Sequence, residues 1–270
     1  MESDAAGLYL NLMKGCLTRL IFPDSCVNHE FRPTGQFDPD ARRNGQDWPS
    51  EAETMIGQKR LDNLQACVTS ALRDGVPGDL VETGVWRGGA AILMRAVLKA
   101  YGDRHRLVWA VDSFAGLPKP DPARYPEDAE DRLWESNDYL GVSLEKVRAN
   151  FARYELLDEQ VRFLKGWFKD TLPQAPIQQI AVLRLDGDMY ESTMDVLNNL
   201  YDKVSDGGYI IVDDYGALKN CKAAIDDFRC ARQIYDPLQQ VDWTGVYWRR
   251  GALRGAATMQ PNNTKAAMNS

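Results

Sequence analysis

The amino-acid sequence predicts an α/β fold in which a mostly parallel sheet of seven strands carries helices on both faces. Two observations lead to this prediction. From residue 79 onward, short apolar runs alternate with helical patterns, and the runs are apolar at successive positions, as in strands buried on both faces. The last two runs, 238–243 and 245–250, are too close together for a crossover helix, which predicts a C-terminal antiparallel hairpin.

The individual elements follow from the same patterns. The strands that precede the hairpin are expected at residues 78–83, 106–112, 160–164, 180–186 and 207–214. The spacers between strands predict crossover helices at roughly 88–101, 143–153, 191–203 and 219–230. Before the first strand, apolar residues near helical spacing predict a helix over 54–75, which Gly75 is placed to end.

We interpret residues 54–250 as the main domain and residues 1–53 as an N-terminal helix and arm. The opening helix has an apolar stripe that has to be buried on the body of the protein or on a second subunit. The stripe consists of Leu8, Leu12, Leu17, Leu20 and Ile21. Residues 23–50 show no clear period and are rich in Pro, Gly, Asp and Arg, so we expect an irregular arm. Residues 251–270 are expected to form a flexible tail.

The amino-acid composition limits which binding partners and which cellular compartment we expect for the protein. The 270 residues carry a net charge of −7 and a pI near 5.0, a balance that repels phosphate groups. Neither nucleic acid nor an anionic membrane is therefore an expected partner. Five cysteines without a CxxC pair argue against a disulfide framework and against a zinc knuckle. Because Lys14 and Arg19 interrupt the first apolar segment, we expect no signal peptide and a cytoplasmic protein.

The turn after the first strand indicates a cofactor site. In the sequence "VETGVWRGGAA", Gly84 allows a tight turn, and the Gly–Gly pair that follows lets backbone N–H groups approach a ligand. Glu82 would repel a pyrophosphate but would tolerate a cation. Asp112 ends the second strand 28 residues after Gly84, where an acidic side chain can bind two ribose hydroxyls. A ligand with a ribose, a positive charge and no phosphate matches S-adenosylmethionine.

Four aspartates are expected at the same edge of the sheet. Asp186 ends the fourth strand, and Asp213 and Asp214 end the fifth, so these carboxylates can converge across strands about 5 Å apart. A hard divalent cation, Mg²⁺ by default, would relieve their repulsion. In a regular strand Asp213 and Asp214 point to opposite faces, so the chain has to bend for both to ligate. Asp186 and Asp188 flank Gly187, and one could hold the ion while the other accepts a proton from a hydroxyl.

Seven stretches of the chain match a known family in the right order. They are "TMIGQKRLDNLQ", "GVPGDLVETGVWRGGA", "VDSFAGLP", "NFARYELLDEQVRFLKGWFKDTLP", "LRLDGDMYEST", "GGYIIVDDY" and "GVYWRR", and they cover roughly residues 54–250. On these motifs the sequence resembles the macrocin O-methyltransferase family, whose S-adenosylmethionine- and Mg²⁺-dependent enzymes methylate sugar hydroxyls of macrolides and related antibiotics. The resemblance implies the class I methyltransferase Rossmann-like fold.

The resemblance also assigns roles by position. It implies cofactor contacts from Thr54, Met55, Glu82, Thr83, Gly84, Asp112, Ser113 and Trp167. It implies Asp186, Asp213 and Asp214 as metal ligands and Asp188 as the base. Of these, Thr54, Met55 and Trp167 rest on the resemblance alone.

The leading hypothesis is an O-methyltransferase that acts on a sugar hydroxyl of a glycosylated secondary metabolite. The alternatives are a methyltransferase of a catechol-like or other vicinal diol, a glycosyltransferase using the DxD motif, and a non-catalytic cofactor-binding subunit. The Pro-rich, acidic segment 117–141 is placed to cover the cofactor as a lid. We further expect a homodimer in which the arm lines the acceptor pocket, with His29 of the arm as a candidate contact.

Overall fold

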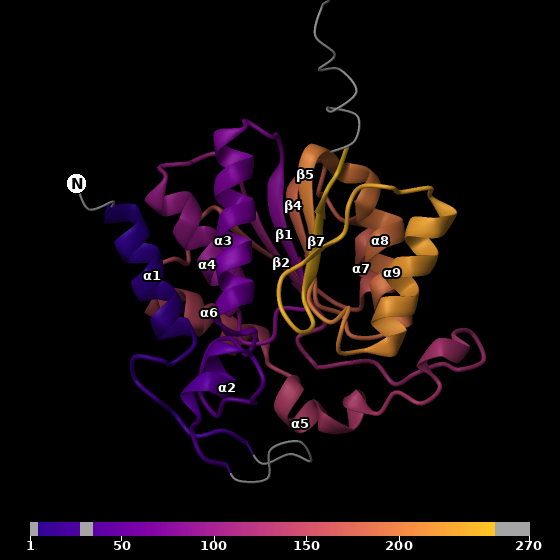
Figure 1. Ribbon diagram of the computed structural model, residues 1–270, viewed down its shortest axis with the longest axis horizontal. Coiled ribbons are helices and arrows are strands. Elements are labelled where there is room, and N and C mark those ends of the chain that lie inside the picture. Colours follow the sequence, from indigo (N-terminus) through magenta and orange to yellow (C-terminus); the bar gives the residue numbers. More distant parts are fainter. Residues whose placement is uncertain (1–4, 28–34, 252–270) are drawn as a thin grey trace, which may run out of the picture.

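The computed structural model describes residues 5–27 and 35–251, and these contain the predicted seven-stranded sheet (Figure 1). The strands are β1 (Asp79–Thr83), β2 (Val108–Asp112), β3 (Val161–Lys165), β4 (Ile180–Leu185), β5 (Val204–Val212), β6 (Gln239–Gln240) and β7 (Val246–Arg249). Their order is β3-β2-β1-β4-β5-β7-β6. Strands β1 to β5 pair in parallel, whereas β7 pairs antiparallel with both β5 and β6. The predicted fold class is therefore confirmed.

Helices cover both faces of the sheet. They are α1 (Ala5–Leu17), α2 (Pro39–Arg43), α3 (Gly57–Arg73), α4 (Gly89–Ala100), α5 (Asn137–Leu140), α6 (Leu144–Arg153), α7 (Phe168–Thr171), α8 (Tyr190–Leu200) and α9 (Lys219–Ala231). In Figure 1, α1, α3, α4 and α6 lie on one side of the sheet, and α7, α8 and α9 lie on the other. Successive strand residues pack on opposite faces of the sheet. Leu80 lies in the core with α3 and α4, and Val81 lies in the core with α8 and α9.

The N-terminal helix α1 packs on its own chain. Leu10, Met13 and Leu17 are buried in the same core as the side chains of α3 and α4. On the opposite face of the helix, Leu8 and Leu12 remain 61% and 56% exposed. Of the predicted apolar stripe, Leu17 is thus buried within the chain, whereas Leu8, Leu12 and Ile21 are exposed.

Some boundaries differ from the prediction. The helix expected over 54–75 begins only at Gly57, whose φ of +74° interrupts the helical run and leaves Thr54 and Met55 in an irregular segment. The arm is not wholly irregular, because it contains α2. Asp38 caps this short helix by accepting two backbone N–H groups of its first turn.

Two predictions fall on parts of the chain that are not described. His29 and nearly all of the expected tail, 252–270, lie outside the described residues. Among the described helices, none has the length and apolarity that a bilayer-spanning segment requires.

Candidate active site

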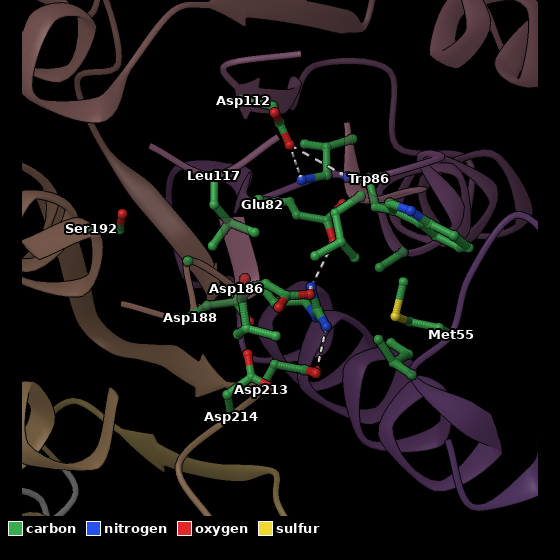
Figure 2. Close-up of a pocket in the computed structure, with 18 of the residues that line it drawn as sticks. Met55, Glu82, Trp86, Asp112, Leu117, Asp186, Asp188, Ser192, Asp213 and Asp214 are labelled. Atoms are coloured by element: carbon green, nitrogen blue, oxygen red, sulfur yellow. Dashed lines mark hydrogen bonds and ion pairs between the residues drawn. The ribbon is translucent and has the colours of Figure 1, made fainter. Parts of the chain in front are cut away.

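A cavity of about 710 Å³ opens at the carboxyl ends of the parallel strands (Figure 2). Its walls come from the strand ends, from residues 45–48 of the arm and from the segment 117–141. The predicted site residues that line it are Thr54, Met55, Glu82, Gly84, Asp112, Ser113, Trp167, Asp186, Asp188, Asp213 and Asp214. The fold therefore brings together residues that the sequence places in separate segments.

Three carboxylates meet at one end of this cavity. One oxygen each of Asp186, Asp188 and Asp214 lies within 4.8 Å of the others. The Asp214 Oδ2 atom is buried and receives no hydrogen bond from any described residue. Burial, and then the charge of the neighbouring aspartates, raises the pKa of all three groups. A carboxylate cluster of this kind fits a divalent cation that prefers oxygen ligands.

A buried arginine contacts the carboxylate cluster through Asp186. Arg184, on β4, is 1% exposed, and its Nη1 donates to Glu82 Oε1 and to Asp186 Oδ2, both at 2.8 Å. Its Nη2 donates to the Asp213 carboxylate. One positive charge is thus shared among three acids. The sequence reasoning missed Arg184, although a charged residue inside an apolar strand was a signal, because a buried charge needs partners.

Asp213 and Asp214 have different surroundings at the end of β5. The regular strand ends one residue before Asp213. The Asp213 carboxylate accepts hydrogen bonds from Arg184 and from Arg60 of α3, whereas Asp214 belongs to the three-carboxylate cluster. For Asp213 to share an ion with Asp186 and Asp214, as the sequence predicts, one of its arginine pairs has to open.

Asp188 lies in the turn between β4 and α8 with a φ of +60°. This is the left-handed backbone region, which costs most non-glycine residues about 1–2 kcal/mol and which Asp and Asn tolerate better than others. Strain of this kind persists where the surrounding structure fixes the residue, and it is concentrated at functional sites. The turn places the Asp188 carboxylate within the cluster.

The turn after β1 is built around Asp112 and Gly84. Asp112 Oδ2 accepts the Val85 N–H at 2.6 Å, and Oδ1 accepts the Phe114 N–H at 2.7 Å. This carboxylate therefore holds the turn, and a ribose hydroxyl would have to share its oxygens. Gly84 has a φ of +84°, and a Cβ at this position would overlap the carbonyl oxygen of Asp186. Glycine is required there because the turn touches the acidic segment.

Glu82 and Thr83, two predicted cofactor contacts, end β1 differently. Glu82 is 1% exposed, lines the cavity and keeps an Oε2 atom that receives no hydrogen bond from the described residues. Burial raises the pKa of Glu82 to about 8. Thr83 is fully buried, and its hydroxyl donates to the Arg184 carbonyl at 3.2 Å. The Thr83 side chain therefore holds β1 against β4, and it is not among the described residues that line the cavity.

The segment 117–141 and the arm close the cavity from outside. Asp128 is fully buried and accepts two backbone N–H groups from the first turn of α8, at 2.7 and 2.9 Å. Tyr139 stacks on Trp48 of the arm, with ring centroids 4.9 Å apart, and its hydroxyl donates to the Pro49 carbonyl at 2.8 Å. The segment is thus anchored near its middle to α8, the helix that follows Asp188, and near its C-terminal end to the arm.

The raised pKa values predict how stability depends on pH without a divalent ion. The folded state holds protons on Asp186, Asp188 and Asp214 that the unfolded chain has released, so stability falls as pH rises above the ordinary carboxyl range. We expect the Tm of the ion-free protein to be lower at about pH 8 than at about pH 5.5. We expect Mg²⁺ to raise the Tm more at the higher pH, because ligand binding stabilises the folded state. Asp214→Asn, which removes one of these carboxylates, should flatten the slope. A Tm that climbs over this range in ion-free buffer would contradict the raised pKa values.

Comparisons with known proteins identify relatives along almost the whole chain. The family model described as macrocin O-methyltransferase (TylF) matches residues 7–250. The chain is 56% identical to the 8-demethyl-8-(2,3-dimethoxy-alpha-L-rhamnosyl)-tetracenomycin-C 4'-O-methyltransferase of Streptomyces olivaceus, over 97% of this chain and 99% of that protein. It is 50% identical to the mycinamicin III 3''-O-methyltransferase of Micromonospora griseorubida, over 93% of this chain and 99% of that protein.

A solved O-methyltransferase structure shows that the similarity extends to the three-dimensional fold. The O-methyltransferase NovP superposes with a TM-score of 0.86 at 52% identity, covering 91% of this chain and 99% of that chain. The family match begins at residue 7, so it includes most of α1 and the arm as well as the sheet. With these matches the resemblance seen in the motifs is confirmed, and the chain belongs to the macrocin O-methyltransferase family.

Proposed function

We propose that this O-methyltransferase transfers the methyl group of S-adenosylmethionine to a sugar hydroxyl of a glycosylated natural product, with Mg²⁺ in the acidic cluster. A single cavity that joins the turn after β1 to Asp186, Asp188 and Asp214 carries this proposal. The acceptor class is supported by relatives named for rhamnosyl-tetracenomycin, mycinamicin III and, in Streptomyces niveus, demethyldecarbamoylnovobiocin. A cytoplasmic location remains part of the proposal, in keeping with an odd number of cysteines and no CxxC pair.

The donor would occupy the end of the cavity near Met55, Trp86 and Asp112. Figure 2 shows these side chains apart from the four aspartates. Met55 and Trp86 offer apolar surface, and Asp112 stands at the end of β2, where ribose hydroxyls are bound in this type of sheet. The Oε2 atom of Glu82 receives no hydrogen bond from the described residues, and a sulfonium cation bound nearby would lower the raised pKa of Glu82 and favour its charged form. Bound there, S-adenosylmethionine supplies an electrophilic methyl group.

The proposed metal ligands are Asp186 and Asp214. Asp213 would be a third ligand once it breaks its hydrogen bond to Arg60 or to Arg184. A divalent ion held there would lower the pKa of an alcohol, which is barely acidic at neutral pH. The buried, unbonded Oδ2 of Asp214 and the closeness of Asp186 support this assignment. Arg184 donates to Asp186 Oδ2, which limits the directions in which the Asp186 carboxylate can turn.

Asp188 is the proposed base. Its carboxylate would accept the proton that the acceptor hydroxyl loses on methylation, and bound S-adenosylmethionine would supply the methyl group. Burial, and then the charge of Asp186, raises the pKa of Asp188 in the ion-free protein, and a divalent ion on Asp186 would favour the ionised Asp188 carboxylate that can accept a proton. The strained turn presents this carboxylate beside the proposed ligands, within reach of the same hydroxyl.

The function is tested by methyl transfer from labelled S-adenosylmethionine in Mg²⁺. The acceptors are demethyldecarbamoylnovobiocin, mycinamicin III and the rhamnosyl-tetracenomycin named for the relatives, with catechol as the comparison. We expect at least one glycoside to gain a single methyl group on a sugar oxygen, located by mass spectrometry and NMR. Methylation of catechol with none of the glycosides would favour the vicinal-diol alternative and overturn the sugar assignment.

The open face of α1 supports the proposed homodimer. Leu8 and Leu12 lie side by side there, and Ile21 and Phe22, just beyond the helix, are also exposed. Burial of exposed leucines drives association. The double variant Leu8→Glu, Leu12→Glu should halve the mass measured by light scattering and keep the fold, since Leu10, Met13 and Leu17 make the contacts within the chain. Tyr235→Glu, at an exposed site far along the chain, is the control. An unchanged mass in the double variant would rule out this face as the dimer contact.

A further inference from the structure

Arg60 of α3 joins three segments that are distant in the sequence. Its Nη2 donates to the Gly45 carbonyl at 3.1 Å, its Nε donates to Asp242 Oδ2 at 3.1 Å, and its Nη1 donates to Asp213 Oδ2. The side chain is 7% exposed. One guanidinium thereby connects the arm, the C-terminal hairpin and the acidic end of β5.

The arm comes close to the start of α3 at Gly45. Gly45 has a φ of +61°, and a Cβ there would collide with Arg60 Nη2 and lie 2.6 Å from the Ile56 carbonyl oxygen. Trp243 reinforces the junction, because its Nε1 donates to the Asn44 carbonyl at 2.8 Å and its ring lies 5.8 Å from the Arg60 guanidinium carbon. In Figure 1 the turn of the C-terminal hairpin runs beside α3 toward α2. The position of the arm is therefore fixed from two sides.

This junction sets the width of the cavity. Residues 45–48 form one wall, and Asp213 and Asp214 stand at the end of β5 on another. Because Arg60 bonds both to the first residue of that arm wall and to Asp213, the same side chain determines how far apart the two walls lie. An acceptor that contacts the arm while presenting a hydroxyl to the acidic cluster depends on that separation.

We propose that Arg60 is a positioning residue that fixes the arm wall of the acceptor site against the acidic end of β5. It acts through the arm and Asp213 and not on the donor. The proposal rests on the proposed function only in naming the arm wall as an acceptor contact. A lysine cannot replace this arginine, since its ammonium group lacks the planar fork that donates in several fixed directions at once.

The test compares Arg60→Lys with Arg95→Lys. Arg95 is the matched control, because it is equally buried, with a side chain 7% exposed, and pairs with Asp158 away from the cavity. Both variants keep the positive charge of the side chain and lose the planar guanidinium group. We expect only Arg60→Lys to speed amide hydrogen exchange in residues 44–48. We also expect it to raise the acceptor KM about tenfold, as for the loss of one charge-assisted hydrogen bond, with kcat nearly kept. Calorimetry should give an unchanged Kd for S-adenosylmethionine.

Gly45→Ala provides a second route to the same junction. Its Cβ should push the arm from Arg60, reproduce the faster exchange and the higher KM, and add little to Arg60→Lys in a double-mutant cycle. If Arg60→Lys does not fold, Gly45→Ala alone decides. Normal arm exchange in the folded variants, or a loss confined to kcat, overturns the proposal. If none of the three glycosides is methylated, the proposed function fails, whereas the exchange data still decide the role of Arg60.

Discussion

Asp188→Asn is expected to lower the turnover number by about 10²-fold or more, because a positioned base typically contributes a factor of that size. Asparagine accepts the left-handed backbone conformation that Asp188 adopts, so the turn between β4 and α8 should be retained. The amide is nearly the same size as the carboxylate but cannot take up a proton. The fold, the bound donor and the bound ion should therefore survive while the chemical step slows.

Single-turnover kinetics with a methylated glycoside as product would measure this loss. Calorimetry on the same variant should show that Mg²⁺ and S-adenosylmethionine still bind. Asp170→Asn is the control, since Asp170 is an exposed aspartate that does not line the cavity among the described residues. Near-normal turnover in Asp188→Asn would remove Asp188 from the mechanism and leave the proton to another group.

The layout of the sheet and the acids could be predicted because both follow from short-range patterns. Doubly apolar runs reveal buried parallel strands, and the residue that follows each run falls at the same edge of the sheet. Asp112, Asp186 and Asp213 were all placed at strand ends in this way, and the structure puts them along one cavity. Gly84 was also expected in the turn, although for its conformation and not for its contact with Asp186.

The charge balance of the site could not be predicted, because it depends on side chains that meet only in the folded protein. Arg60 lies 153 residues from Asp213, and no local pattern relates them. Arg184 was visible as a charge in a strand, but its partners depend on the register that pairs Glu82 with Arg184 across β1 and β4. The division of Asp213 and Asp214 between arginines and the cluster follows from these contacts.

Removal of divalent ions is expected to abolish methyl transfer, and Mg²⁺ is expected to restore it. Without an ion, Asp186, Asp188 and Asp214 repel one another, and the raised pKa of each shows that they hold protons more tightly than usual. A protonated Asp188 cannot serve as a base, and an alcohol with its ordinary pKa is a weak nucleophile. Both effects act in the same direction, so we expect activity below detection in excess chelator.

The cofactor affinity separates this prediction from a general loss of structure. Met55, Trp86 and Asp112 lie away from the acidic cluster in the cavity (Figure 2), so calorimetry should give nearly the same Kd for S-adenosylmethionine with and without chelator. Asp214→Asn should need more Mg²⁺ for half-maximal activity, because it removes a proposed ligand whose Oδ2 is otherwise unsatisfied. Full activity in excess chelator, with normal donor binding, would contradict the metal assignment. The three aspartates would then have only an acid–base role.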